Sequence, residues 1–218
     1  WPTNDPVFAT ESERTTWTET PVPSGPVPQW IIDEANRELD ILCETILRYG
    51  ATVYRPKPQD YVVLDGMYNY CPRDRLLIWG DTIVDPAMMY PCRDQEILVL
   101  DEVTHKSHNR KVMPRDEGMI LDAANICRLN DNWIFLESAS GNRKAYEWMC
   151  DQFPEVKIEL VNFYNGIHID STVTPLREGL VVLNAGRVNE DNCPKAFDQW
   201  DKIYVTAEDI EPQSFYEY

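Results

Sequence analysis

Apolar residues recur every three or four positions between residues 29 and 49, which is the spacing of one face of an α-helix. The stripe consists of Ile32, Ala35, Leu39, Leu42 and Ile46. Gly50 follows where many helices end, because glycine adopts the left-handed backbone conformation without a steric penalty. The pattern predicts a helix over residues 29–49, and residues 51–55 predict a short strand that Pro56 ends.

After residue 75 the helical pattern gives way to short apolar runs joined by tight turns. Residues 76–84 and 126–136 predict two β-hairpins, and the second is followed by a predicted helix over 142–153 and a strand over 156–161. A second block has the same order, with strands over 171–174 and 180–183, a short helix over 194–200, and a strand over 202–205. Recurrence after about 45 residues predicts a repeated hairpin-helix-strand unit of the α/β class, which must pack against its neighbours.

The first 28 residues contain six prolines among Thr, Ser and Glu, and they predict an irregular N-terminal segment, with the globular domain over residues 29–218. No run approaches the ~20 apolar residues that a membrane span requires. No basic, apolar leader opens the chain either. These observations predict a cytoplasmic protein with no membrane partner.

The formal net charge is −17, from 37 acidic and 20 basic residues spread through every segment. A surface of this sign repels phosphates, so it excludes nucleic acid as a partner, and it favours the approach of cationic substrates. Solubility, or a salty habitat, explains the charge more simply than a steering role does.

Six cysteines lie far apart, without a Cys-x-x-Cys pair or a histidine at zinc-finger spacing. The sequence therefore predicts no metal and no cofactor. The cysteines are interpreted as reduced, partly buried thiols, with Cys43 on an apolar helical face.

Of the three histidines, His105 and His108 lie in a polar stretch typical of a solvated loop. His168 follows a predicted turn and starts a predicted strand, in which residues two apart face the same way, so His168 and Asp170 share one side. A carboxylate beside a histidine controls its charge and tautomer, as general acid and base catalysis requires. A structural hydrogen-bonded pair at a strand end is the simpler alternative.

Two further aspartates stand beside predicted strands. Asp122 ends the strand-like run 118–121 and precedes Ala123 and Ala124, whose small side chains leave room for a neighbour or a ligand. Asp74 comes just before the first predicted hairpin. The alternative for both is a turn or cap aspartate, a common role for this residue.

Several segments, taken in order, resemble the arginine:glycine amidinotransferase family, whose pentein fold is a propeller of five hairpin-helix-strand modules around a central active site. The resemblance covers roughly residues 32–206. The segments that carry it are Thr52-Val-Tyr-Arg-Pro56, Pro72-Arg-Asp74, Leu76-Leu-Ile-Trp-Gly80, Leu121-Asp-Ala-Ala124, Tyr146-Glu-Trp-Met149 and His168-Ile-Asp170-Ser-Thr172. Each is weak alone, and their shared order, with Arg187 at the family's distance beyond the histidine, is what makes them specific.

The resemblance implies a role for each candidate residue. His168 matches the catalytic histidine and Asp122 the carboxylate that orients it. Asp74 and Asp170 match the aspartates that hold the guanidinium, and Arg187 matches the arginine that binds the donor's carboxylate.

The implied reaction moves the amidino group of arginine to an amine, with glycine as the expected acceptor and ornithine and guanidinoacetate as products. It passes through an amidino-cysteine intermediate and needs no cofactor. The expected partners are small molecules, with a homodimer left open. Other readings are an amino-cyclitol phosphate acceptor, a hydrolase resembling arginine deiminases, and a guanidine-binding or structural protein without catalysis.

The sequence departs from the family in several places. None of the six cysteines occupies the family's nucleophile position, and Cys193 is interpreted as a semi-buried thiol. The first module is not recognisable before residue 29, residues 94–117 are shorter than the family's stretch, and Asn125 replaces an acid. Residue 1 is Trp rather than Met. These departures predict an incomplete pentein domain, a fragment with about three of the five modules, that lacks the nucleophile.

Overall fold

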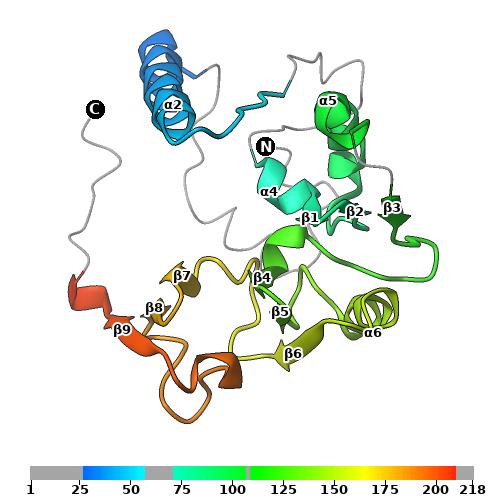
Figure 1. Ribbon diagram of the computed structural model, residues 1–218, viewed down its shortest axis with the longest axis vertical. Helices are drawn as coiled ribbons and strands as arrows, with labels where there is room; N and C mark the ends of the chain where they lie inside the picture. The colour runs from blue at the N-terminus through cyan, green and yellow to red at the C-terminus, as the bar shows by residue number, and fades with distance from the viewer. Residues whose placement is uncertain (1–26, 57–70, 107–108, 210–218) are drawn as a thin grey trace.

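The computed structural model describes residues 27–56, 71–106 and 109–209 of the 218-residue chain (Figure 1). The proline-rich segment predicted over residues 1–28 lies almost entirely outside the described residues. Within them, no helix is long and apolar enough to cross a membrane.

Three sheets of the same design follow one another along the chain. In each, an antiparallel hairpin is joined by a third strand that runs parallel to the second. The strands are β1 (Leu77–Trp79), β2 (Thr82–Asp85) and β3 (Asn109–Val112); β4 (Ile126–Leu129), β5 (Asn132–Leu136) and β6 (Lys157–Val161); β7 (Val173–Arg177), β8 (Leu180–Asn184) and β9 (Asp201–Val205). The first strand of each sheet lies toward the middle of the molecule and the third toward its outside (Figure 1).

A parallel third strand requires a crossover, and helical segments supply it in each unit. They are the 3-10 helix η1 (Pro91–Leu100) with α5 (Asp101–Thr104), the helix α6 (Arg143–Gln152), and the 3-10 helix η3 (Lys195–Phe197). The predicted hairpin-helix-strand repeat is therefore confirmed. The sequence did not predict β3 or η1, and the helix predicted over 194–200 was too long.

Local sequence explains where the hairpins turn. Gly80, Asn130 and Gly179, one at each hairpin turn, all have positive φ angles, of 58°, 52° and 79°. Glycine and asparagine are the residues that accept this conformation most readily. The second crossover begins at Asn142, whose side chain accepts a 3.0 Å hydrogen bond from the backbone N–H of Ala145 and so caps α6.

The strand β5 joins two hydrophobic clusters because both of its faces are buried. Trp133 and Phe135 point into a cluster with β1, β2 and α6, while Ile134 and Leu136 point into a second cluster with β7, β8 and η3. Alternation along a strand sends neighbouring side chains to opposite faces, and an apolar run suits a strand covered on both. In the first cluster, Trp133 also packs edge-on against Trp79, with ring centroids 5.8 Å apart. The strand β5 therefore packs the second unit against both the first and the third unit.

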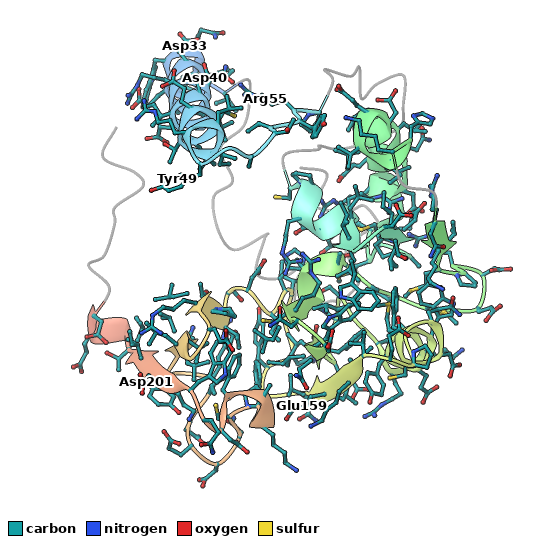
Figure 2. All side chains as sticks on the ribbon, in the orientation of Figure 1. Asp33, Asp40, Tyr49, Arg55, Glu159 and Asp201 are labelled. Atoms are coloured by element: carbon teal, nitrogen blue, oxygen red, sulfur yellow. The ribbon has the colours of Figure 1, made fainter. Side chains whose placement is uncertain are left out.

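The helix α2 (Gln29–Arg48) confirms the predicted first helix. None of its residues is buried, and the apolar side chains Trp30 and Leu42 are 54% and 53% exposed. Figure 2 shows Arg55 near α2, where its Nη1 pairs with Asp40 Oδ1 at 2.6 Å. An exposed ion pair of this kind contributes little stability.

Two expected strands are absent from the described residues. Residues 51–55 pair with no strand there, and in the strand-like run 118–121 only Leu121 pairs, through an isolated bridge to Gly141. A strand is stabilised by a neighbouring strand, so apolar and β-branched content alone did not suffice.

Candidate active site

Three of the candidate residues occupy the same place in three successive units, just before the first strand. Asp74 lies in the short helix α4 (Pro72–Arg75) ahead of β1, and Asp122 lies ahead of the 3-10 helix η2 (Ala123–Asn125) and β4. His168 lies in the loop that leads to β7. Because the first strands face the middle of the molecule, these side chains meet there. They line a cavity of about 510 Å³ together with Cys71, Pro72, Arg73, Tyr90, Arg93, Ile167 and Asp170.

The sequence predicted that His168 starts a strand, and this prediction is wrong. Its φ is 61°, in the left-handed region, and the strand begins only at Val173. Hydrogen bonds hold this unusual backbone, from the His168 N–H to Ser140 Oγ at 3.3 Å and from the Ile169 N–H to the Ala124 carbonyl at 3.1 Å. His168 and Asp170 still line one cavity, through a turn and not through strand alternation.

Asp122 is bound on both of its oxygens. Oδ2 lies 3.1 Å from His168 Nε2, and Oδ1 accepts a 2.9 Å hydrogen bond from the backbone N–H of Met89. The residue stands at the start of η2, but its side chain makes no capping hydrogen bond. It is buried, so its carboxylate holds the imidazole from a fixed position.

The imidazole of His168 is surrounded by negative charge. Burial alone would lower its pKa, but the hydrogen bond to Asp122 and the charges of Asp74, Asp122 and Asp170 outweigh burial, and the pKa of His168 is raised above its usual value. Nδ1 lies 3.8 Å from Asp74 Oδ1. These interactions stabilise the imidazolium form relative to that of an ordinary histidine, and an imidazolium can donate a proton to a leaving group.

Replacing Asp122 with asparagine should lower the pKa of His168, because a stabilising charge disappears while burial remains. NMR titration of the histidine Cε1–H signals measures it, with the exposed His105 as an internal reference. The raised pKa stabilises the fold fully below about pH 6.5, and this contribution is lost as pH rises through the folded-state pKa. The difference in the free energy of unfolding between wild type and D122N should therefore narrow as the pH rises through the folded-state pKa of His168. An unchanged His168 pKa in D122N would contradict the geometry.

Asp74 belongs to a buried network that sequence reasoning missed. Arg93 Nη1 donates to Asp74 Oδ2 at 2.9 Å, and the same guanidinium binds Glu96 through Nε at 2.7 Å and Nη2 at 3.0 Å. Next to it, Arg75 pairs with Asp85 at 2.6 Å and fastens α4 to β2. Asp74 is thus fixed with Oδ2 occupied and Oδ1 toward the histidine. The Arg-x-x-Glu spacing was the only signal for this network, in a segment without helical periodicity.

Arg187 does not line the cavity; the other four predicted residues do. Its Nη1 donates to Ser171 Oγ at 2.9 Å and to Thr172 Oγ1 at 2.8 Å, and its Cζ lies 3.8 Å from the centroid of the Tyr164 ring. Ser171 and Thr172 line a second cavity of about 330 Å³, which shares Asp170 with the first. Arg187 therefore lies beside the candidate site, bound to two residues of the second cavity that Asp170 connects to the first.

The first cavity brings carboxylates and guanidinium groups together. Three carboxylates, Asp74, Asp122 and Asp170, face two guanidinium groups. One of these belongs to Arg93, and the other, that of Arg73, is held by the carbonyls of Ala123 and Ile126 at 2.9 Å each. The described residues contain no group of three or more His, Cys, Asp or Glu that could hold a metal ion.

Among the cysteines whose side chains the structure describes, Cys71 lines the cavity. Burial, together with the charge of Asp74, raises the pKa of its thiol. Burial also raises the pKa of Cys127, to about 11, and that of Cys193. A thiol is a nucleophile only as its thiolate, so these environments are unsuited to attack. Among the described residues, Cys43, Cys71, Cys127, Cys150 and Cys193 form no disulfide.

Replacing Cys71 with alanine should leave turnover within about twofold of wild type, because its raised thiol pKa makes it a poor nucleophile. Steady-state rates of the complete protein measure it. A thousandfold loss in C71A, with an unchanged denaturation midpoint, would make Cys71 the nucleophile instead.

Comparison with known proteins supports the resemblance. No family model matches the sequence. The chain is 32% identical over 230 residues to inosamine-phosphate amidinotransferase 1 of Streptomyces griseus, covering 90% of this chain and 66% of that protein. It is 23% identical over 207 residues to mitochondrial glycine amidinotransferase of Danio rerio, covering 73% of this chain and 49% of that protein. The chain thus spans slightly less than two thirds of the relative with the higher identity.

The structure gives the same result. The solved structure of inosamine-phosphate amidinotransferase from Streptomyces griseus superposes with a TM-score of 0.75 at 29% identity, over 91% of this chain and 65% of that one. The repeated sheets, with the cavity toward their first strands, and the likeness to this structure define an α/β protein of the pentein superfamily. Within it, the chain belongs to the amidinotransferase family.

Proposed function

We propose that the protein transfers the amidino group of L-arginine to a primary amine through an amidino-cysteine intermediate. The observation that carries this proposal is the placement of His168 between Asp122 and Asp74 in a cavity that Asp170 also lines. Such a cavity combines a proton-transfer group with carboxylates that can hold a planar cation.

Asp74 and Asp170 would bind the guanidinium of the donor. A guanidinium is planar, permanently charged and rich in N–H donors, so two carboxylates give oriented, charge-assisted hydrogen bonds. Arg93 occupies Asp74 Oδ2, which leaves Oδ1 for the substrate. Fixed carboxylates also keep the guanidinium carbon in place for attack.

His168 would move the protons of both half-reactions. A thiolate attacks the guanidinium carbon, the bond from that carbon to the ornithine nitrogen breaks, and imidazolium donates its proton to the departing amine. The acceptor amine then attacks the amidino carbon, neutral His168 takes its proton, and the carbon–sulfur bond breaks to restore the thiolate. Asp122 stabilises the cation that forms in each cycle.

We also infer that the nucleophilic cysteine belongs to a part of the protein outside these 218 residues, and that residues 29–218 are part of a larger pentein domain. The raised thiol pKa of Cys71, Cys127 and Cys193 supports this inference. The three described units, and the coverage of 66% of a relative, agree with it.

The acceptor would be an amine of low molecular weight. The resemblance alone suggested glycine, but the identity of 32% to a protein named for inosamine phosphate, against 23% to one named for glycine, favours an amino-cyclitol phosphate. The alternative hydrolase would place water where the amine attacks.

The test is a product analysis of the complete reading frame that contains this chain. The protein is given arginine with inosamine phosphate, glycine or lysine, and mass spectrometry follows ornithine and the guanidino product. We expect ornithine in equal amounts with a guanidino product of one acceptor. Citrulline and ammonia without an acceptor would show a hydrolase, and binding of arginine without turnover would show a guanidine-binding protein.

A further inference from the structure

The side chain of Tyr164 closes the loop that precedes His168. Its hydroxyl donates to the carbonyl of Ile167 at 3.0 Å and accepts from the N–H of the same residue at 3.1 Å. Ile167 lines the 510 Å³ cavity and is bonded directly to His168. The phenol thus fixes the backbone immediately before the left-handed histidine.

The ring of the same tyrosine lies under Arg187. The guanidinium carbon is 3.8 Å from the ring centroid, well inside the range of a cation–π contact. Nη1 of Arg187 is bound by Ser171 and Thr172. Among the residues that the structure describes, Nε and Nη2 of Arg187 have no hydrogen-bonding partner, so a carboxylate can approach them.

Gly166 makes this arrangement possible. A Cβ atom on Gly166 would lie 2.1 Å from Cζ and 2.2 Å from Cε2 and Oη of Tyr164. Such distances are far below van der Waals contact, so any side chain at this position would displace the ring. The close approach of ring and backbone depends on the absence of a side chain at Gly166.

We propose that Tyr164 is a positioning residue that holds Arg187 and the His168 loop in one arrangement, so that the carboxylate and guanidinium ends of the donor are bound together. The proposal rests on the proposed function, in which the donor is arginine. It makes Tyr164 a determinant of selectivity for an amino-acid donor, because a guanidine without a carboxylate gains nothing from Arg187. The two roles lie in different parts of the side chain, the hydroxyl for the histidine loop and the ring for Arg187.

Two variants separate these roles in the complete protein. Tyr164→Phe keeps the ring and loses the hydroxyl, so we expect an unchanged KM for arginine and a several-fold lower kcat. Tyr164→Leu loses both, so KM for arginine should also rise roughly tenfold, the scale of one desolvated cation–π contact. The inhibition constant of agmatine, which is arginine without its carboxylate, should stay within about twofold of wild type in both.

Tyr146→Phe is the matched control. The Tyr146 hydroxyl bonds the Ile158 carbonyl at 3.3 Å, and the residue packs on the first hydrophobic cluster away from the cavity. Tyr146→Phe deletes the same hydroxyl group as Tyr164→Phe, at a position that does not contact the site. The kcat and KM of this variant should therefore equal those of wild type.

Gly166→Ala tests the proposal from the opposite side and remains informative if Tyr164→Leu does not fold. The added methyl group should displace the ring and raise KM for arginine, with agmatine inhibition unchanged. In a Tyr164→Leu background the same substitution should add less than half of its effect, because the ring is already gone.

The outcomes are distinct. A wild-type protein that does not process arginine overturns the proposed function and this proposal with it. An active wild type in which Y164L weakens arginine and agmatine equally, or neither, overturns this proposal alone. Selective loss of arginine in both Y164L and G166A supports it.

Discussion

Replacing His168 with alanine should reduce amidino transfer by the complete protein by roughly 10³-fold, within the range that general acid and base catalysis contributes. The leaving amine then has no proton donor, and the acceptor amine has no base. Ornithine release in a single turnover and steady-state kinetics measure the two half-reactions separately.

His105→Ala is the control for that variant. His105 is exposed at the end of α5, outside the cavity, so its removal should leave both half-reactions unchanged. Equal activity of H168A and wild type would defeat the role assigned to His168. The side chain of His168 is 18% exposed and borders the cavity, so we expect the fold of the variant to survive.

Replacing Asp74 with asparagine should lower kcat/KM for arginine by roughly 10²-fold. The amide keeps the shape of the carboxylate but removes the charge that would face the donor's guanidinium, and hydrogen bonds to charged groups contribute about 1.5–3 kcal/mol. Arg93 also loses one of its two buried carboxylate partners, so the free energy of unfolding should fall by about 3 kcal/mol. Initial rates and urea denaturation measure the two effects.

Asp94→Asn is the matched control for Asp74→Asn. Asp94 pairs with Arg115 near the surface, and it does not line the cavity. We expect near wild-type kcat/KM for this variant and a loss of stability below about 1 kcal/mol. A D74N protein whose kcat/KM for arginine equals that of D94N would remove Asp74 from the guanidinium site.

Sequence patterns predicted the elements in which apolar residues recur at a regular spacing, including α2, none of whose residues is buried. The hairpin β4–β5 was recognised because its apolar strands flank an Asn-Asp-Asn turn, and Asn130 takes the left-handed conformation that such a turn needs. The edge strand β3 was missed because it reads Asn-Arg-Lys-Val and has no buried residue. Its pairing with β2 comes from backbone hydrogen bonds, which no pattern of apolar residues records.

In the candidate site, too, the sequence predicted some features and missed others. His168 and Asp170 were grouped correctly but for the wrong reason, since a left-handed turn and not a strand brings them to one cavity. Arg93 could not be ranked above any other arginine, because its importance comes from burial beside Asp74, 19 positions away. No sequence pattern pointed to Tyr164, since the residues that it contacts depend on the path of a loop.

Because Asp74, Asp122 and His168 hold equivalent positions in three units, the spacing of these proposed catalytic groups depends on how the units pack against one another. Each unit delivers one group from the same place, so a slight rotation of the third unit against the second would change the distance from His168 Nε2 to Asp122 Oδ2 directly. The joint is the strand β5, whose Ile134 and Leu136 bind the next unit. A substitution that loosens this packing, such as Ile134→Ala, should therefore lower the turnover rate under conditions where the chain is still folded.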